Sequence, residues 1–391
     1  MSVGMPPGST GGLYGFGGFG GGPDALLHGT EFELALGGDE DSSGGWLRRR
    51  LSVWGQGDIQ TFHGAPTVYR YDARYDGDMR TGYVGVDARL TERWLAGVAV
   101  SRSGGRSDWQ VGASRGHLKT KLTALHPYVQ WSDGTTSVWT MAGGGWGDGE
   151  AENVREATGL LGTSTLGLRL GLVELRRELG AVGGGAEFGL RADAAWAELR
   201  TGEGRETVDG LAAAVNQQRV GAEAARPLRL GPLALQPFGA AHLRRDGGAG
   251  QTGTGVEVAF GLGLTGGIVR LDVQARTLAV HSASGYGERG AGLTLTVGGQ
   301  KREGLSLSVS PTWGDAASGT GALWQEEVYR HYLPEKEQDT FAVDARGDYG
   351  MRLPNGGLLS WFGSYSHSPY GRGFLVGGSI GGLADALLPG R

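Results

Sequence analysis

The chain has 391 residues with 78 glycines, no cysteine and a formal net charge of -5 at pH 7. The absence of cysteine excludes disulfides, thiolate metal sites and cysteine nucleophiles. Lysine and arginine are interleaved with aspartate and glutamate, which argues against a nucleic-acid partner, and no run of about 18 apolar residues could form a helical membrane span.

The first 46 residues divide into two predicted segments. Residues 1–22 are rich in glycine and show no hydrophobic period, so we expect a flexible lead-in that cannot bury a core. Residues 23–46 are expected to form a linker, in which Pro23 to His28 is a short helix candidate with proline and aspartate in its first turn. No signal peptide is visible, and we expect the true N-terminus to lie upstream.

From residue 47 to residue 391 apolar residues recur at every second position, which predicts one large β domain. In one run Val256 and Val258 flank Glu257, and the alternation continues to Leu264. Strands of about ten residues with a single apolar face are typical of an antiparallel, up-and-down transmembrane β-barrel. We expect the apolar face to contact lipid at Val84, Val86, Phe188, Leu190, Val256, Val258, Phe260, Leu262, Val269, Leu271 and Val273.

The opposite phase of these strands carries glycine, serine, threonine and charged residues. In a barrel this face lines a polar lumen, where small residues leave space and opposite charges pair across neighbouring strands. We predict lumen-facing charges at Glu187, Arg191, Asp193, Arg270, Asp272, Arg276, Asp344 and Arg346. Solvated ion pairs without a specific function are an equally good interpretation of these residues.

A soluble β-sandwich has the same period of two and is the main structural alternative. A sandwich needs bulky inward residues to fill its core, whereas the second phase here is small or charged. Lipid outside and water inside satisfy both faces, which favours the barrel.

Several tryptophans fall near the ends of predicted strands, where an indole ring can lie at the level of the lipid headgroups. We predict an aromatic girdle that includes Trp94, Trp131, Trp196 and Trp313. Ordinary core packing is the alternative for any single one of them.

Turn signals separate the predicted strands. Asp133-Gly134, Asp246-Gly247 and Asn355-Gly356 are suited to tight hairpins because the second residue can adopt a positive φ angle, and Gly266-Gly267 is a further break. The polar stretch 324–338 is expected to be an outside loop.

The sequence offers no candidate enzyme chemistry. Residues 112–116 match the letters of a serine-hydrolase elbow, but a glycine-rich chain produces such matches by chance, and the strand-turn-helix context is missing. The glycines of the lead-in lack the lysine and hydroxyl residue of a phosphate-binding loop. The eight histidines are scattered and form no metal-ligand spacing. We therefore expect no catalytic residue, no metal and no cofactor.

An ordered series of short motifs spreads over most of the chain, roughly from residue 24 to residue 380. The series consists of Val53–Asp58, Gly82–Asp87, Trp94–Ala99, His126–Tyr128, Gly143–Gly147, Arg244–Gly247 and Gly304–Gly314. Each motif alone is weak, but together they resemble the autotransporter β-domain family. The resemblance implies type V secretion machinery in the outer membrane of a Gram-negative cell, with lipid, the outer-membrane assembly machinery and the chain's own passenger as partners.

The resemblance also implies a barrel of about 12 strands, preceded by a helix in the pore and by an N-terminal passenger exposed at the cell surface. Residues 23–36 resemble the pore segment. The chain ends in Leu387-Leu388-Pro389-Gly390-Arg391 instead of a strand with a terminal aromatic residue, so we expect it to lack its final strands.

Three functions are compatible with such a barrel. The leading hypothesis is a translocator that anchors an N-terminal segment and passes it through the lumen to the cell surface. The second is a passenger-less surface protein or adhesin that acts through its outside loops. The third, a solute-conducting pore, is disfavoured because a helix in the pore would block conductance.

Overall fold

The computed structural model describes residues 51–64, 67–68, 71–111, 114–153, 160–182, 185–205, 210, 212–248, 252–284, 286–298, 304–314, 341–353, 358–369 and 371–381. The predicted lead-in, pore segment, outside loop 324–338 and Asn355-Gly356 turn lie outside these residues. Regular structure in the described ranges consists of strands. None of those ranges contains a helix long and apolar enough to cross a membrane.

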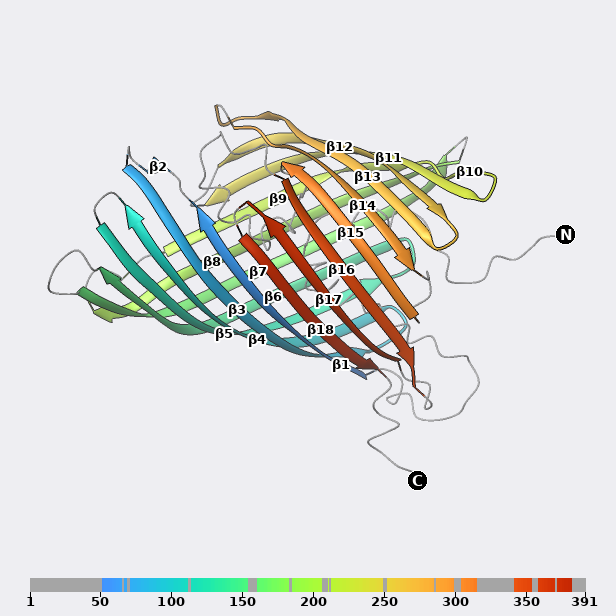
Figure 1. Cartoon of the computed structure of the whole chain (residues 1–391). Coiled ribbons are helices and arrows are strands. Elements are labelled where there is room, and N and C mark those ends of the chain that lie inside the picture. Colours follow the sequence, from blue (N-terminus) through green and yellow to red (C-terminus); the bar gives the residue numbers. More distant parts are fainter. Residues whose placement is uncertain are drawn as a thin grey trace, which may run out of the picture.

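Antiparallel strands follow one another around a single sheet (Figure 1). They are β1 (Leu51–Gly64), β2 (Thr67–Val68), β3 (Tyr71–Arg89), β4 (Trp94–Val111), β5 (Ser114–Ser132), β6 (Thr136–Asn153), β7 (Leu160–Val182), β8 (Ala186–Arg205), β9 (Ala212–Ala225), β10 (Leu228–Leu230), β11 (Leu233–Gly248), β12 (Gly253–Gly266), β13 (Val269–His281), β14 (Arg289–Gly298), β15 (Gly304–Gly314), β16 (Phe341–Arg352), β17 (Leu358–Ser368) and β18 (Gly371–Gly381).

Two of these segments are continuations of longer strands. β2 pairs with β3 in the register that β1 already has, and β10 pairs with β11 in the register of β9. At the second break Pro227 cannot donate a backbone hydrogen bond, but the Arg226 amide still donates to the Pro237 carbonyl at 3.0 Å. The described sheet therefore has 16 barrel strands.

The sheet closes on itself because the first strand pairs with the last. β1 and β18 run antiparallel, from the pair Ser52 and Gly381 to the pair Phe62 and Gly371. This closure leaves no open edge in the described sheet, and it confirms the predicted all-β, antiparallel, up-and-down barrel. The predicted number of about 12 strands is wrong, because it rests on the family resemblance and not on the alternating runs themselves.

The two rims of the barrel differ in the length of their connections. Turns at one rim are short, with residues 133–135, 231–232 and 267–268 among them, and we call it the short-turn rim. The connections at the other rim, the long-loop rim, include residues 315–340. β1 begins and β18 ends at the short-turn rim. Both flanking segments of the chain therefore join the barrel at the short-turn rim.

The predicted hairpin turns have mixed outcomes. Asp133-Gly134 is a turn in which Gly134 has φ +93° and Asp133 Oδ1 accepts hydrogen bonds from the Thr135 and Thr136 amides. Hydrogen bonds from the Thr136 amide first, and then from the Thr135 amide, hold the pKa of Asp133 below its usual range. Gly266-Gly267 ends β12, as predicted.

The predicted turn at Asp246-Gly247 is wrong. Both residues lie inside β11, where they pair with Gln217 and Asn216 of β9. The Asp246 carboxylate accepts hydrogen bonds from Arg244 and Gln217 instead of capping a turn. The carboxylate here has a partner on the neighbouring strand, Gln217, and a partner on its own strand, Arg244.

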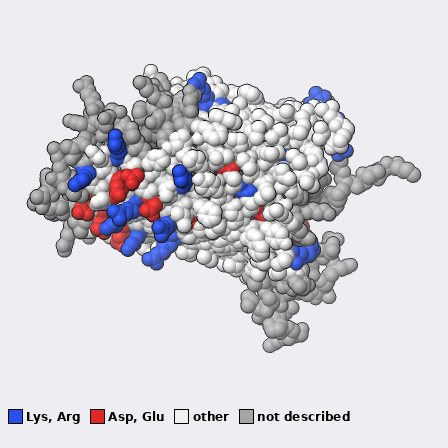
Figure 2. Space-filling view, in the orientation of Figure 1, with Lys and Arg blue, Asp and Glu red and all other residues white. Residues whose placement is uncertain are grey.

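The barrel wall is taller on one side than on the other (Figure 1). β3 to β8 have 18 to 23 residues each, whereas β14 to β18 have 10 to 12. Figure 2 shows charged residues gathered at the end of the molecule where β3 to β6 reach furthest, and a largely uncharged surface over the rest of that view. The long strands therefore carry a charged surface beyond the uncharged band.

Many glycines of the polar phase lie beneath aromatic rings. Each such glycine is directly opposite the aromatic residue on the neighbouring strand, and a Cβ atom there would overlap the ring. The pairs include Trp54 with Gly85, Tyr128 with Gly97, Phe238 with Gly261, and Phe362 with Gly377. These glycines allow aromatic rings to pack flat against the wall, in addition to the predicted role of leaving space.

Candidate translocation lumen

The two faces of the wall differ as the alternation predicts. Eight of the predicted lipid-facing residues are exposed, at 38–61% of their surface. They are Val84, Val86, Phe188, Leu190, Phe260, Leu262, Val269 and Val273. Val256, Val258 and Leu271 are half-buried on the same face. Lipid contact at these positions stays a prediction.

The predicted girdle tryptophans are distributed along the outward face. Trp94 and Trp131 are directly opposite each other at the short-turn rim, with ring centroids 6.3 Å apart. Trp313 lies near the long-loop end of β15, and the centroid of its ring is 5.3 Å from that of Phe341. Trp196 is exposed but lies in the middle of the long strand β8 rather than near its end.

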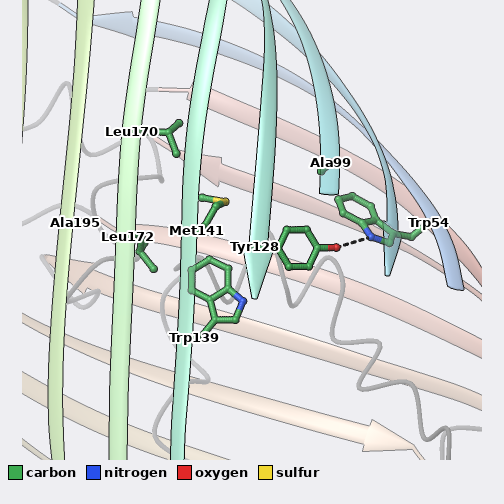
Figure 3. Packing of buried hydrophobic residues seen from close by; sticks show 8 residues of the cluster. All are labelled: Trp54, Ala99, Tyr128, Trp139, Met141, Leu170, Leu172 and Ala195. Atoms are coloured by element: carbon green, nitrogen blue, oxygen red, sulfur yellow. Dashed lines mark hydrogen bonds between the residues drawn. The ribbon is translucent and has the colours of Figure 1, made fainter. Parts of the chain in front are cut away.

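An aromatic and aliphatic cluster lines the inward face of β1 and β4 to β8 (Figure 3), and we call it the aromatic patch. Trp54 Nε1 donates to Tyr128 Oη at 3.2 Å and to Asp87 Oδ1 at 3.3 Å. The Tyr128 hydroxyl donates to the same carboxylate, and Ser52 Oγ donates to it at 3.2 Å. The other members are Ala99, Trp139, Met141, Leu170, Leu172 and Ala195. The polar atoms of the two rings thus fix their orientation on the inner wall.

Next to the aromatic patch, arginines and carboxylates on β7 to β13 and the following connection form what we call the lumen ion network. Arg219 on β9 donates to Asp193 at 2.8 Å and to Glu257 at 2.9 Å. Arg276 donates to the other Glu257 oxygen at 2.8 Å and also pairs with Glu288. All five side chains are buried. Glu257 therefore links two arginines from different strands.

The network extends in both directions along the wall. Arg244 donates to Glu288 at 2.6 Å and to Asp246 at 2.8 Å. On the other side Arg191 pairs with Glu174 at 3.0 Å. Each arginine thus meets at least one carboxylate, and the fork-shaped guanidinium groups satisfy several acceptors at once. Arg176 and Glu223, 3.1 Å apart, complete the lumen ion network.

Three of the eight predicted lumen charges, Arg191, Asp193 and Arg276, belong to this network. Four others lie elsewhere on the wall. Arg270 pairs with Asp272 at 2.6 Å. Arg346 lies above the ring of Phe362 and is two residues from Asp344, which is half-buried. Glu187 near the short-turn rim has one buried carboxylate oxygen without a hydrogen-bond partner among the described residues. The role of all eight in a hydrated pore stays a prediction.

The sequence interpretation missed the centre of the network. Arg219, Arg244, Glu257 and Glu288 contribute most of its contacts, yet none was selected as a candidate. Glu257 did stand on the polar phase of its strand, between Val256 and Val258, and that signal could have identified it. The pairing of Arg219 with Glu257 joins β9 to β12, which no local pattern reveals.

The described residues contain no group of three histidine, aspartate or glutamate side chains that could hold a metal ion. Ser114 begins β5 and is directly opposite Val111 of β4, so the described residues on both sides of this motif belong to strands. A nucleophile elbow requires a strand followed by a helix.

The autotransporter β-domain family model matches residues 53–300, from the first strand into the connection after β14. The chain belongs to the autotransporter β-domain family. The barrel is accordingly a β-barrel of the Gram-negative outer membrane, as the sequence resemblance predicted. No curated protein matches the sequence.

Solved structures of related architecture are only distantly similar to the chain. The β domain of the Bordetella autotransporter BrkA is 14% identical with a TM-score of 0.35, over 84% of this chain and 98% of that one. The translocator domain of NalP from Neisseria meningitidis is 12% identical with a TM-score of 0.32, over 92% and 98%. CdiB from Acinetobacter baumannii is 10% identical with a TM-score of 0.46, and the match covers 84% of this chain but 60% of CdiB. The family assignment rests on the match over residues 53–300.

Proposed function

We propose that this barrel anchors an N-terminal passenger segment in the outer membrane and passes it through its lumen to the cell surface. The observation that carries the proposal is the position of Leu51, where β1 begins at the short-turn rim next to the end of β18. In outer-membrane barrels the short turns face the periplasm, so the polypeptide before Leu51 joins the barrel on the periplasmic side. A segment attached there can reach the outside without leaving its own barrel only through the lumen.

The inner wall suits a passing polypeptide. An extended chain carries backbone donors and acceptors at every residue, and these need polar partners wherever water is scarce. The lumen ion network offers many such groups, but its charges are already paired with each other, from Arg176 on β7 to Arg276 on β13. A balanced wall presents no strong field of one sign, so it would select little for the charge of the passenger.

The aromatic patch supplies a place where the passing segment can stop. Trp54 lies only three residues after the start of β1, and Trp54 and Tyr128 are held by Asp87 on the inward face. Residues 23–46, the predicted linker and pore segment, end four residues before this strand begins and contain Leu26, Leu27 and Phe32. We propose that these apolar residues pack on the aromatic patch after the passenger has passed.

From the family assignment we also propose that the outer-membrane assembly machinery inserts this barrel into the membrane. A second candidate function is a passenger-less surface protein or adhesin. The long connection 315–340 at the long-loop rim favours it, because long extracellular loops are the usual binding elements of such barrels.

Epitope tags on intact cells separate the two functions. The chain is produced behind an export signal with a tag after Gly12, after Gly267 or within 315–340. Translocation predicts that antibody labels the first and third tags on intact cells and the second only after permeabilisation. Labelling of the third tag alone would reject translocation and favour the adhesin. A barrel that is absent from the membrane fraction would reject both.

A further inference from the structure

Three cations form a compact group on the outward face of β3, β4 and β5. Arg80 and Lys121 are both directly opposite Gly104, and Arg102 is two residues before Gly104 on the same strand. Residues two apart on a strand, or directly opposite on its neighbour, point to the same face. Arg80, Arg102 and Lys121, which we call the outward cation group, therefore surround Gly104 on the outside of the barrel.

The outward cation group lies at the upper edge of the apolar belt. Outward residues of β4, counted from the short-turn rim, are Trp94, Ala96, Val98 and Val100, and the next one is Arg102. A membrane-spanning strand needs about 9–11 residues, so the first charge on β4 falls where the lipid headgroups begin. Trp146, with 63% of its surface exposed, lies two strands from Arg102 in the same row of paired residues. An exposed tryptophan at this level is typical of the membrane interface.

The charges of this group are available to a ligand. Within the described ranges Arg102 and Lys121 have no carboxylate within ion-pair distance, and Arg80 Nε is 3.7 Å from Asp78 with 74% of its side chain exposed. Gly82, directly opposite Arg102, faces open space, and a Cβ atom at Gly104 would meet only a backbone oxygen at 3.8 Å. The surface between the three cations is therefore free of side chains.

The next outward row, further from the belt, has a different arrangement. This row runs across β3 to β6 through four residues directly opposite one another, in the order Asp78, Arg106, Lys119 and Glu150. It therefore has a carboxylate at each end and two cations between them. Lys119 pairs with Glu150 at 3.4 Å, and Arg106 lies 3.6 Å from Asp108. Figure 2 shows this mixture of both signs at the charged end of the molecule. In the row that meets the membrane Asp148 of β6 is directly opposite Lys121, but within the described ranges no ion pair joins the two, so the cations of this row are less compensated than Lys119 and Arg106 in the row beyond.

We propose that Arg80, Arg102 and Lys121 bind the phosphate groups of a lipid headgroup in the outer leaflet. The long-loop rim faces the cell exterior, so the leaflet at this level is the outer one. Arginine and lysine are the usual phosphate ligands, and each cation near an anionic lipid surface contributes to membrane attachment. The bound lipid would fix the height of the tall wall, β3 to β8, in the membrane.

Lipid binding to the purified barrel tests this proposal. The probe is bisphosphorylated lipid A, with its dephosphorylated form as the matched lipid, and native mass spectrometry of the barrel in detergent measures occupancy. The triple variant R80Q/R102Q/K121Q should lose affinity for the phosphorylated lipid by about fivefold per cation, on the order of a hundredfold in total. The control R106Q/K119Q removes two nearby cations from the paired row and should retain the wild-type affinity.

Two outcomes would overturn the proposal. Wild-type protein that binds both lipids equally would exclude phosphate recognition. A control variant that loses as much affinity as the triple variant would show that lipid binding depends on the overall positive charge and not on these three residues. Heat-modifiable gel mobility establishes that each variant is folded before binding is measured. The surface-tag experiment remains informative either way, because it does not depend on lipid selectivity.

Discussion

Trp54 lies flat against Gly85, the residue directly opposite it on β3, and no side chain could be added at Gly85 without overlap with the indole ring. Gly82, on the outward face of the same strand, faces open space. Gly85→Ala should therefore displace Trp54 from Tyr128 and Asp87, at a cost of about 1–3 kcal/mol for overpacking. Gly82→Ala should change stability by less than about 0.5 kcal/mol. Urea unfolding of the refolded barrels compares the two, and equal midpoints would contradict the inward position of Trp54.

Glu257 should be far more important for stability than a surface carboxylate of the same kind. Glu257→Gln replaces the carboxylate that Arg219 and Arg276 share with a neutral amide in a buried environment, and loss of one buried charged partner costs about 3–5 kcal/mol. Glu150→Gln removes the exposed partner of Lys119 and should cost at most about 1 kcal/mol. The comparison uses the urea midpoints of both variants. Similar small shifts for both would show that water fully screens the lumen ion network.

Brominated lipids distinguish the outward from the inward tryptophans. Bromine on the acyl chains quenches only indole rings that reach the bilayer, so Trp196→Phe should reduce the quenched fraction of the fluorescence. Trp54→Phe should not change the amount of fluorescence that the brominated lipids remove, because Trp54 is buried on the inner face. If Trp54 contributes to the quenched signal and Trp196 does not, the two faces of the wall are reversed.

Asp133 should stabilise its turn in a pH-dependent way. Its pKa is lowered in the folded state because backbone amides of Thr136 and Thr135 donate to the carboxylate. A lowered pKa means that the stabilisation is present above the unfolded value of about 4 and is lost as the pH falls through the folded value. The difference in unfolding midpoint between wild type and Asp133→Ala should therefore be larger at pH 7 than at pH 3. A difference that does not depend on pH would assign the effect to backbone propensity alone.

The period of two was enough to predict the fold class and the two faces of the strands. Val84 and Phe260 are exposed, and Asp193 and Arg276 are buried on the opposite face. This succeeded because the side-chain direction in a strand depends on the sequence position alone. The same reasoning could not decide what touches each face, so lipid contact still needs the quenching experiment.

Properties that depend on distant residues were harder to predict. The strand number follows from the pairing of β1 with β18, whose residues are more than three hundred positions apart in the sequence. The partners of Arg219 are likewise set by the order of strands around the barrel. Asp246 was assigned to a turn because local chemistry favours one there, whereas its actual partners come from β9 and from Arg244 on its own strand.

Closure of the barrel by β1 and β18 underlies every other conclusion, and cysteine cross-linking tests it directly. The chain has no native cysteine, so the pairs Gly57→Cys with Val376→Cys and Asp58→Cys with Leu375→Cys can each be introduced alone. Neighbouring pairs alternate in type along an antiparallel ladder, so one of the two has the short spacing that favours a disulfide. Gly57→Cys with Ala345→Cys is the control, because Ala345 follows the cleaved connection but lies on β16, which pairs with β15 and β17 and not with β1.

After oxidation of the folded barrel in membranes and protease cleavage of the connection 315–340, we expect at least one β1–β18 pair to hold the two fragments together until a reductant is added. The control pair should release them. Fragments that separate without reductant for both β1–β18 pairs, in protein shown to be folded by its heat-modifiable mobility, would contradict the closed barrel of 16 strands.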